Sequence, residues 1–152
     1  MVRAVRALLR RSDRTERLLV CRNGSGWSDV HANDLNIRFK ELVGDEYSVK
    51  DLRTWHGTVL AATALAEADP PDSERVAKRA VSAVMKQVSE DLGNTPAVAR
   101  SAYVDPRVVT GYRRGMTIAA AAQRAARQKD AADAACTLEK ATRSLVRRVA
   151  RS

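Results

Sequence analysis

LGNTPAVARSAYVDP, residues 92–106, is the segment from which the fold of this chain can be predicted. Gly93 can adopt the left-handed conformation that ends a helix, so a long helix is expected to stop there. Asn94 or Thr95 can then cap a short second helix with Pro96 at its first position. The segment therefore predicts a tight connection between two helices.

Tyr103 is expected near the end of this second helix, which Asp105-Pro106 stops. The rigid start of the helix holds the tyrosine at a fixed offset from the side-chain amide of Asn94. A hydroxyl in this position can attack an electrophile while a nearby donor stabilises the oxygen that gains charge. Tyr103 is therefore a candidate nucleophile.

Apolar residues recur at helical spacing before this segment, and they predict three helices. One runs from about residue 33 to Gly44, one starts after a Ser48 cap and fades at residues 68–71, and one covers residues 72–92. In the second helix, the residues expected to face inward are Leu52, Trp55, Val59 and Ala62. The buried stripe of the third is expected to be Ala77, Val81, Val84, Met85, Val88 and Leu92.

The two ends of the chain are predicted to differ from each other. Residues 2–11 have helical spacing, residues 17–22 read as a short strand, and residues 23–26 read as a turn. Residues 117–135 are rich in alanine, and a basic helical pattern follows them. Alanine favours helix but buries little surface, so this tail is either a docked helix or a partly disordered arm.

The charge of the chain favours an acidic partner. The 152 residues carry a net charge of +9, and nucleic acid is favoured over a membrane or an acidic protein. Residues 1–22 contribute +5 and residues 105–152 contribute +7, whereas residues 23–104 contribute −3. The two ends are therefore basic, and the middle that holds Tyr103 is not.

Cysteines and histidines show no spacing typical of a metal site. Cys21 and Cys136 lie far apart in the sequence, and His31 and His56 are scattered, so no zinc motif can be written. Two free thiols in a cytosolic protein are expected. The apolar residues at the start are interrupted by arginines, so no secretory signal is predicted, and no apolar stretch is long enough to span a membrane.

A second segment gives Tyr103 its context. Residues 48–58, SVKDLRTWHGT, stand upstream of Leu-Gly-Asn and of a tyrosine nine residues after the asparagine. This set resembles the active-site segments of type IB DNA topoisomerases, in particular the small poxvirus and bacterial branch. The resemblance implies a mainly α fold, the C-terminal helical part of the topoisomerase IB and tyrosine recombinase catalytic fold, with a short strand or hairpin near the N-terminus. Matched residue by residue, it implies that Arg53, Asn94 and Tyr103 are catalytic.

By resemblance, Tyr103 attacks a phosphodiester of double-stranded DNA and forms a 3′-phosphotyrosyl bond, and the freed 5′-hydroxyl reverses the step after the cut strand swivels. Arg53 would grip phosphate oxygens with its planar fork, and Asn94 would donate to a non-bridging oxygen. Lys50 and Arg100 would contact the DNA backbone. The scheme needs no ATP, metal or other cofactor. A monomer is favoured over an oligomer, in the cytoplasm and associated with the nucleoid.

The resemblance also divides the chain. Residues 1–30 correspond to an incomplete N-terminal edge of the catalytic domain, residues 31–116 to a helical catalytic core, and residues 117–152 to an Ala/Arg-rich helix or tail. The family carries another arginine and a general-acid lysine upstream, but residues 17–30 contain no lysine. The chain is therefore expected to be an N-terminally truncated piece that relaxes DNA poorly or not at all.

Two alternatives remain open. The chain can be a non-catalytic, basic and helical DNA-binding remnant, in which the arginine-rich ends hold phosphates without sequence preference. A diverged tyrosine recombinase is less favoured, because recombinases usually have histidine at the positions of Lys50 and Asn94. The alternatives differ in one respect: only in an enzyme would Tyr103 and Arg53 matter beyond the charge that they contribute to DNA binding.

Overall fold

The computed structural model describes residues 2–11, 17–24 and 26–152. Its contacts divide the chain into two compact units, Met1–Val49 and Lys50–Ser152. The described part is mainly helical, with a two-stranded antiparallel hairpin near the N-terminus. The predicted fold class is therefore confirmed.

The first unit contains helix α1 (Val2–Leu9), strands β1 (Val20–Asn23) and β2 (Gly26–Asp29), and helix α2 (Ala32–Val43). Val20 lies opposite Asp29 in the hairpin. The strand was expected from residue 17, but it begins at Val20. The carbonyls of Arg17 and Leu18 instead accept hydrogen bonds from the guanidinium of Arg11, in place of bonds from a neighbouring strand.

The second unit is helical. Its elements are α3 (Val49–Glu67, whose first residue ends the first unit), α4 (Glu74–Leu92), α5 (Pro96–Val98), the π-helical turn η1 (Ala99–Tyr103), α6 (Pro106–Arg113), α7 (Ala119–Ala125) and α8 (Ala131–Val149). The predicted stripe of α4 is buried from Ala77 to Val88. Tyr112 of α6 is also buried, and its hydroxyl donates to the carbonyl of Asp69 at 2.8 Å, which satisfies the one polar group that it carries into the core.

The inward face of α3 differs from the prediction. The buried residues are Gly57, Thr58, Ala61, Ala62 and Leu65. Leu52 is 52% exposed, and it lines an apolar cavity of about 330 Å³ with Trp55 and Val59. The prediction assumed that the largest apolar residues mark the buried face. Ala62 is buried as expected, whereas the face also includes Thr58, Leu65 and Gly57, and Gly57 allows the Tyr103 backbone to approach closely.

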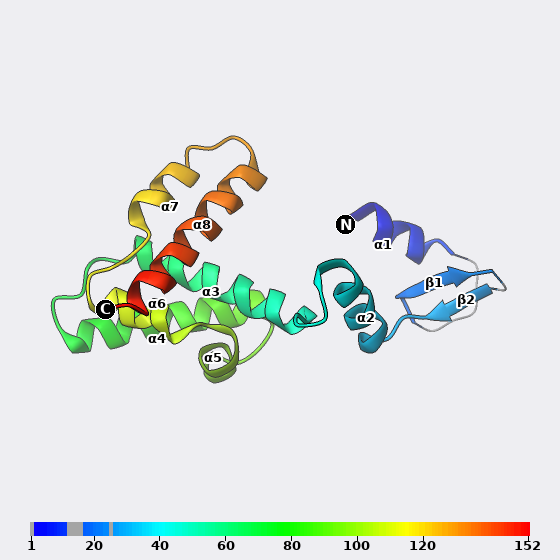
Figure 1. Ribbon diagram of the computed structural model, residues 1–152, viewed down its shortest axis with the longest axis horizontal. Helices are drawn as coiled ribbons and strands as arrows, with labels where there is room; N and C mark the ends of the chain where they lie inside the picture. Colours follow the sequence, from blue (N-terminus) through cyan, green and yellow to red (C-terminus); the bar gives the residue numbers. More distant parts are fainter. Residues whose placement is uncertain (1, 12–16, 25) are drawn as a thin grey trace. The chain divides into compact units, whose positions relative to one another are not determined.

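The C-terminal segment is docked as two helices. Residues 126–130 separate α7 from α8, and the Asp130 carboxylate caps α8 by accepting from the N–H groups of Ala132 and Asp133. Helix α8 packs along α7 and α6, and it buries Leu145 and Val149 in the core (Figure 1). Within the described residues, no helix combines the length and hydrophobicity that crossing a bilayer requires.

Candidate active site

The turn that precedes Tyr103 is built as the local sequence predicts. Gly93 ends α4 in the left-handed region with φ 63°, and the N–H of Asn94 donates to the carbonyl of Ser89 at 2.9 Å. The Thr95 hydroxyl accepts from the N–H of Val98 at 3.3 Å and caps α5, which has Pro96 at its start. These bonds determine the direction in which the chain leaves α4.

Tyr103 is the last residue of a π-helical turn, which the sequence analysis did not foresee. Wide turns of this kind are rare and occur frequently at functional sites. The chain becomes extended at Val104, and the Asp105 carboxylate caps α6 by accepting from the N–H of Arg107 at 2.9 Å. Tyr103 is therefore held between two capped helices, with its side chain half-buried.

Helix α3 packs directly against the backbone of Tyr103. A Cβ atom at Gly57 would lie 2.7 Å from the Tyr103 carbonyl oxygen, closer than non-bonded atoms approach. The Thr58 hydroxyl donates to the carbonyl of Thr54 at 2.8 Å and accepts from the N–H of Asp105 at 3.1 Å. These contacts attach the end of the π-helical turn to α3.

Arg53 connects the tyrosine to the turn after α4. Its Cζ lies 4.9 Å from the centroid of the Tyr103 ring, and its guanidinium also donates to the carbonyl of Leu92. That carbonyl is one of those left unpaired at the C-terminus of α4, where a positive charge is favoured. A guanidinium has five N–H donors, so the bond to Leu92 leaves others for a ligand.

Asn94 follows Leu92 by two residues and carries an amide without a partner. Both polar atoms of its side chain are shielded from solvent, and neither has a hydrogen-bond partner in the described part of the chain. A buried amide in this state costs about 1–3 kcal/mol. An acceptor supplied by a ligand would pair the N–H donors of the amide and remove part of that cost.

Lys50 and Arg100 are placed differently from each other. Lys50 lies at the start of α3, one turn before Arg53, and its carbonyl accepts from the Thr54 hydroxyl at 3.0 Å. Arg100 lies in η1 but lines a separate cavity of about 210 Å³ together with Arg113. The structure therefore gathers Arg53, Tyr103 and the Asn94 turn, whereas Arg100 points to another part of the surface.

One ion pair lies next to Tyr103 in the chain. The Arg107 guanidinium contacts the Asp105 carboxylate at 2.5 Å. This hydrogen bond lowers the pKa of the Asp105 carboxyl below its ordinary value, although partial burial opposes the change. Among the residues described, no three His, Cys, Asp or Glu side chains are grouped so that they could hold a metal ion.

Sequence reasoning missed Gly57 and Thr58 as parts of the site. A usable signal was present, because a glycine inside a helical pattern costs about 1 kcal/mol relative to alanine and suggests a packing reason. The partner of that glycine could not be read from the pattern. Only the folded chain shows that the partner is Tyr103.

Comparison with known families decides what kind of domain carries this site. The family model described as eukaryotic DNA topoisomerase I, catalytic core, matches residues 6–132, which is more than half of the chain. The chain belongs to this topoisomerase I family. No curated protein gave a significant match.

Membership of the topoisomerase I family supports a topoisomerase-like, DNA-directed function. The matched range includes Arg53, Asn94 and Tyr103, and it ends two residues into α8 rather than covering it. The resemblance to the poxvirus and bacterial branch stays a prediction. So do the roles of the individual site residues.

Proposed function

We propose that this topoisomerase-family chain cleaves one strand of duplex DNA by the type IB mechanism, with Tyr103 as the nucleophile. The phenol oxygen attacks a phosphorus atom and loses its proton, while the bond from phosphorus to the 5′-oxygen breaks and that oxygen gains a proton. A 3′-phosphotyrosyl bond and a 5′-hydroxyl result. The hydroxyl later attacks the phosphorus and expels Tyr103, which restores the strand without an external energy source.

The observation that carries this proposal is the position of Arg53. Its guanidinium lies over the Tyr103 ring and is bonded to Leu92, two residues before Asn94. A phosphate attacked by Tyr103 would meet a charge that is present at all relevant pH values and a planar fork suited to two phosphate oxygens. Arg53 is therefore assigned to stabilising the negative charge that grows during attack.

Asn94 is assigned to a non-bridging phosphate oxygen. Its amide is shielded from solvent and has no partner in the described part of the chain, so a bond to DNA requires the turn to expose the amide but would replace no bond inside the protein. Lys50, one helical turn before Arg53, is assigned to the neighbouring backbone. Arg100 is assigned to a more distant phosphate, because it lines a cavity with Arg113 that Tyr103 does not line.

The leaving 5′-oxygen needs a proton, and the hairpin offers no lysine to supply it. Strands β1 (VCRN) and β2 (GWSD) lack the residue that the family uses as general acid. The loss of a general acid typically reduces a rate ~10²–10⁴-fold. We therefore expect the 152-residue chain to cleave slowly and to relax supercoiled DNA poorly.

A trapping assay tests the proposal. The purified chain is incubated with nicked duplexes. Because of the nick, cleavage releases a short 5′-hydroxyl fragment that diffuses away, so religation fails. The cut strand is labelled at its 5′ end, on the part that stays bound to the protein. A denaturing gel then shows whether label migrates with the protein. We expect a band from the wild type and from Tyr47→Phe, a control at a half-exposed tyrosine, but none from Tyr103→Phe.

Other outcomes would contradict the proposal. A band that persists in Tyr103→Phe excludes this nucleophile, and label transfer only from the 3′ side excludes type IB polarity. If no band forms while salt-sensitive DNA binding is intact, the chain is a non-catalytic DNA-binding protein, an alternative that the +9 net charge favours.

A further inference from the structure

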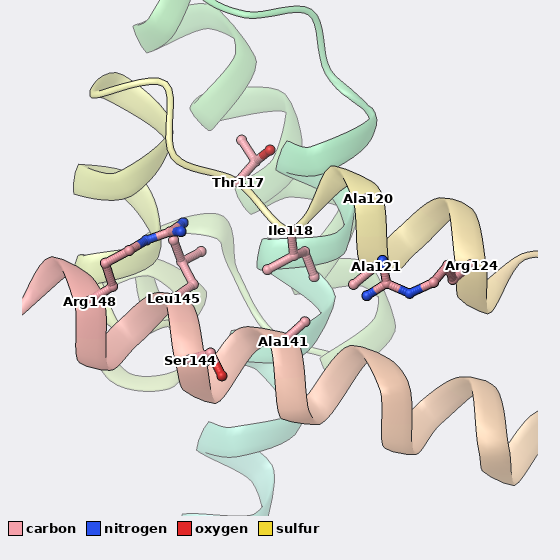
Figure 2. A pocket seen from close by; sticks show the side chains of 9 residues that line it. All are labelled: Thr117, Ile118, Ala120, Ala121, Arg124, Ala141, Ser144, Leu145 and Arg148. Carbon is pink, nitrogen blue, oxygen red and sulfur yellow. The ribbon is translucent and has the colours of Figure 1, made fainter.

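Helices α7 and α8 enclose a cavity of about 390 Å³ away from Tyr103 (Figure 2). Its floor is formed by buried apolar side chains, Ile118 and Ala121 on the α7 side and Leu145 on α8. The volume corresponds to about thirteen water molecules at ~30 Å³ each, enough for a phosphate with part of its sugar. The cavity can therefore hold more than an ordered ion.

Two arginines flank this cavity from opposite helices, Arg124 on α7 and Arg148 on α8. Figure 2 shows the two side chains on opposite sides of Ile118, each extending toward it. Neither arginine has an ion-pair partner in the described ranges, and none of the residues that line the cavity is acidic. With no carboxylate among the lining residues, both guanidinium groups are available to an anion.

The hydroxyl groups at the cavity differ in what they can offer. Thr117 Oγ1 accepts from the N–H of Ala119 at 3.3 Å, which leaves its own proton for a ligand. The Ser144 hydroxyl donates to the carbonyl of Lys140 at 2.9 Å, so its proton is used within α8. The donors available to an anion are therefore the two guanidinium groups and the Thr117 hydroxyl.

We propose that this cavity binds a backbone phosphate of duplex DNA, at a point separate from the strand that Tyr103 attacks. Guanidinium forks match phosphate oxygens, and the apolar floor suits the face of a deoxyribose. Duplex DNA is the favoured anion because the family acts on DNA and residues 105–152 carry a net charge of +7. The inference rests on the DNA substrate of the proposed function but not on cleavage. Arg148 lies beyond the matched range, so the family match does not assign this site.

The test measures DNA binding in a Tyr103→Phe background, in which the proposed cleavage cannot occur. Fluorescence anisotropy of a labelled duplex of about 25 base pairs is recorded from low to moderate salt. Arg124→Ala/Arg148→Ala is compared with Arg127→Ala/Arg147→Ala. The control pair removes the same charge from neighbouring positions that do not line the cavity.

We expect the cavity pair to weaken binding about 10- to 100-fold, as loss of charged hydrogen bonds typically does, and the control pair to weaken it at most a few-fold. The slope of log K against log salt should fall by about 0.9 for the one lost phosphate contact. If the alanine pair is less stable than the parent, Arg124→Gln/Arg148→Gln replaces it, because glutamine keeps most of the aliphatic stem. The glutamine pair should bind DNA as weakly as expected for the alanine pair.

Equal losses in both pairs would overturn the proposal, because they would show an effect of general charge. Binding by the cavity pair that equals the parent would also overturn it, as would failure of the parent to bind DNA at low salt. The trapping assay with Tyr103 intact is scored separately. Failure of cleavage and failure of this site are therefore distinguished.

Discussion

Gly57 of α3 lies against the backbone of Tyr103, so closely that a Cβ atom at Gly57 would be 2.7 Å from the tyrosine carbonyl oxygen. The same atom would lie 3.1 Å from Cδ1 of Leu92. The helix that carries Arg53 therefore meets the end of α4 and the proposed nucleophile at a position where no side chain fits.

Gly57→Ala should impair covalent complex formation by at least tenfold. Alanine normally stabilises a helix interior by about 1 kcal/mol relative to glycine, but here the methyl group must push the Tyr103 backbone away. Overpacking of this kind costs about 1–3 kcal/mol, so thermal stability should also fall. Gly24→Ala is the control, because a Cβ there meets nothing within 4 Å. Unchanged trapping in Gly57→Ala would show that the contact does not position Tyr103.

Thr58→Val should destabilise the chain by about 1–3 kcal/mol. The substitution preserves shape but removes the acceptor for the N–H of Asp105, which is then left buried without a partner. Thr63→Val on the same helix is the matched control, since the Thr63 hydroxyl is buried with no partner among the described residues. Urea unfolding of both variants measures the difference. Equal stabilities would mean that the Thr58 bond contributes nothing.

Asn94→Ala should reduce the rate of covalent complex formation ~10²-fold without loss of stability. Removal of one preorganised donor to a developing oxyanion typically has an effect of this size. The amide makes no hydrogen bond that the fold needs, so the melting temperature should stay constant or rise slightly. Single-turnover trapping and thermal melting are measured on the same preparation. A parallel loss of both quantities would indicate a structural role instead.

Arg53→Ala should lower the trapping rate ~10²–10³-fold, and Arg53→Lys should recover part of it. Lysine keeps the charge but cannot present two parallel donors, so recovery is expected to be incomplete. The bond to Leu92 and the contact with the Tyr103 ring are both exposed, so stability should change by less than about 1 kcal/mol. Arg79→Ala, on the polar face of α4, serves as the charge control. If Arg53→Ala is trapped at the same rate as Arg79→Ala, Arg53 does not contribute to catalysis.

Asp105→Asn should lower the melting temperature at neutral pH, and this difference should shrink only as the pH falls below 3.8. The Arg107 hydrogen bond depresses the pKa of the folded carboxyl below 3.8, so its contribution is full above that value and is lost as the pH falls through the folded pKa. Asparagine remains a good N-cap, so the substitution isolates the charge. Melting curves at pH 7, 4 and 3 should converge on acidification. A constant difference at all three values would contradict this origin.

The sequence by itself determined the local geometry around Tyr103. Gly93 ends α4, and Thr95 and Pro96 start α5, each as the local pattern predicts. Caps and turns depend on residues within a few positions of one another, so they can be read along the chain. The two segments that resemble the topoisomerase site can be recognised in the sequence because each is short and continuous.

The tertiary structure alone decided which residues meet. Arg53 and Leu92 are 39 residues apart, and Thr58 and Asp105 are 47 apart, and no local period encodes such pairs. The buried face of α3 was predicted from its large apolar residues, yet Leu52 is exposed and Gly57 lies at the contact, because a residue without a Cβ atom admits the Tyr103 backbone. The cavity between α7 and α8 also depends on tertiary packing, because its lining residues come from both helices. Its two arginines become neighbours only when both helices bury their alanine and leucine faces in one core.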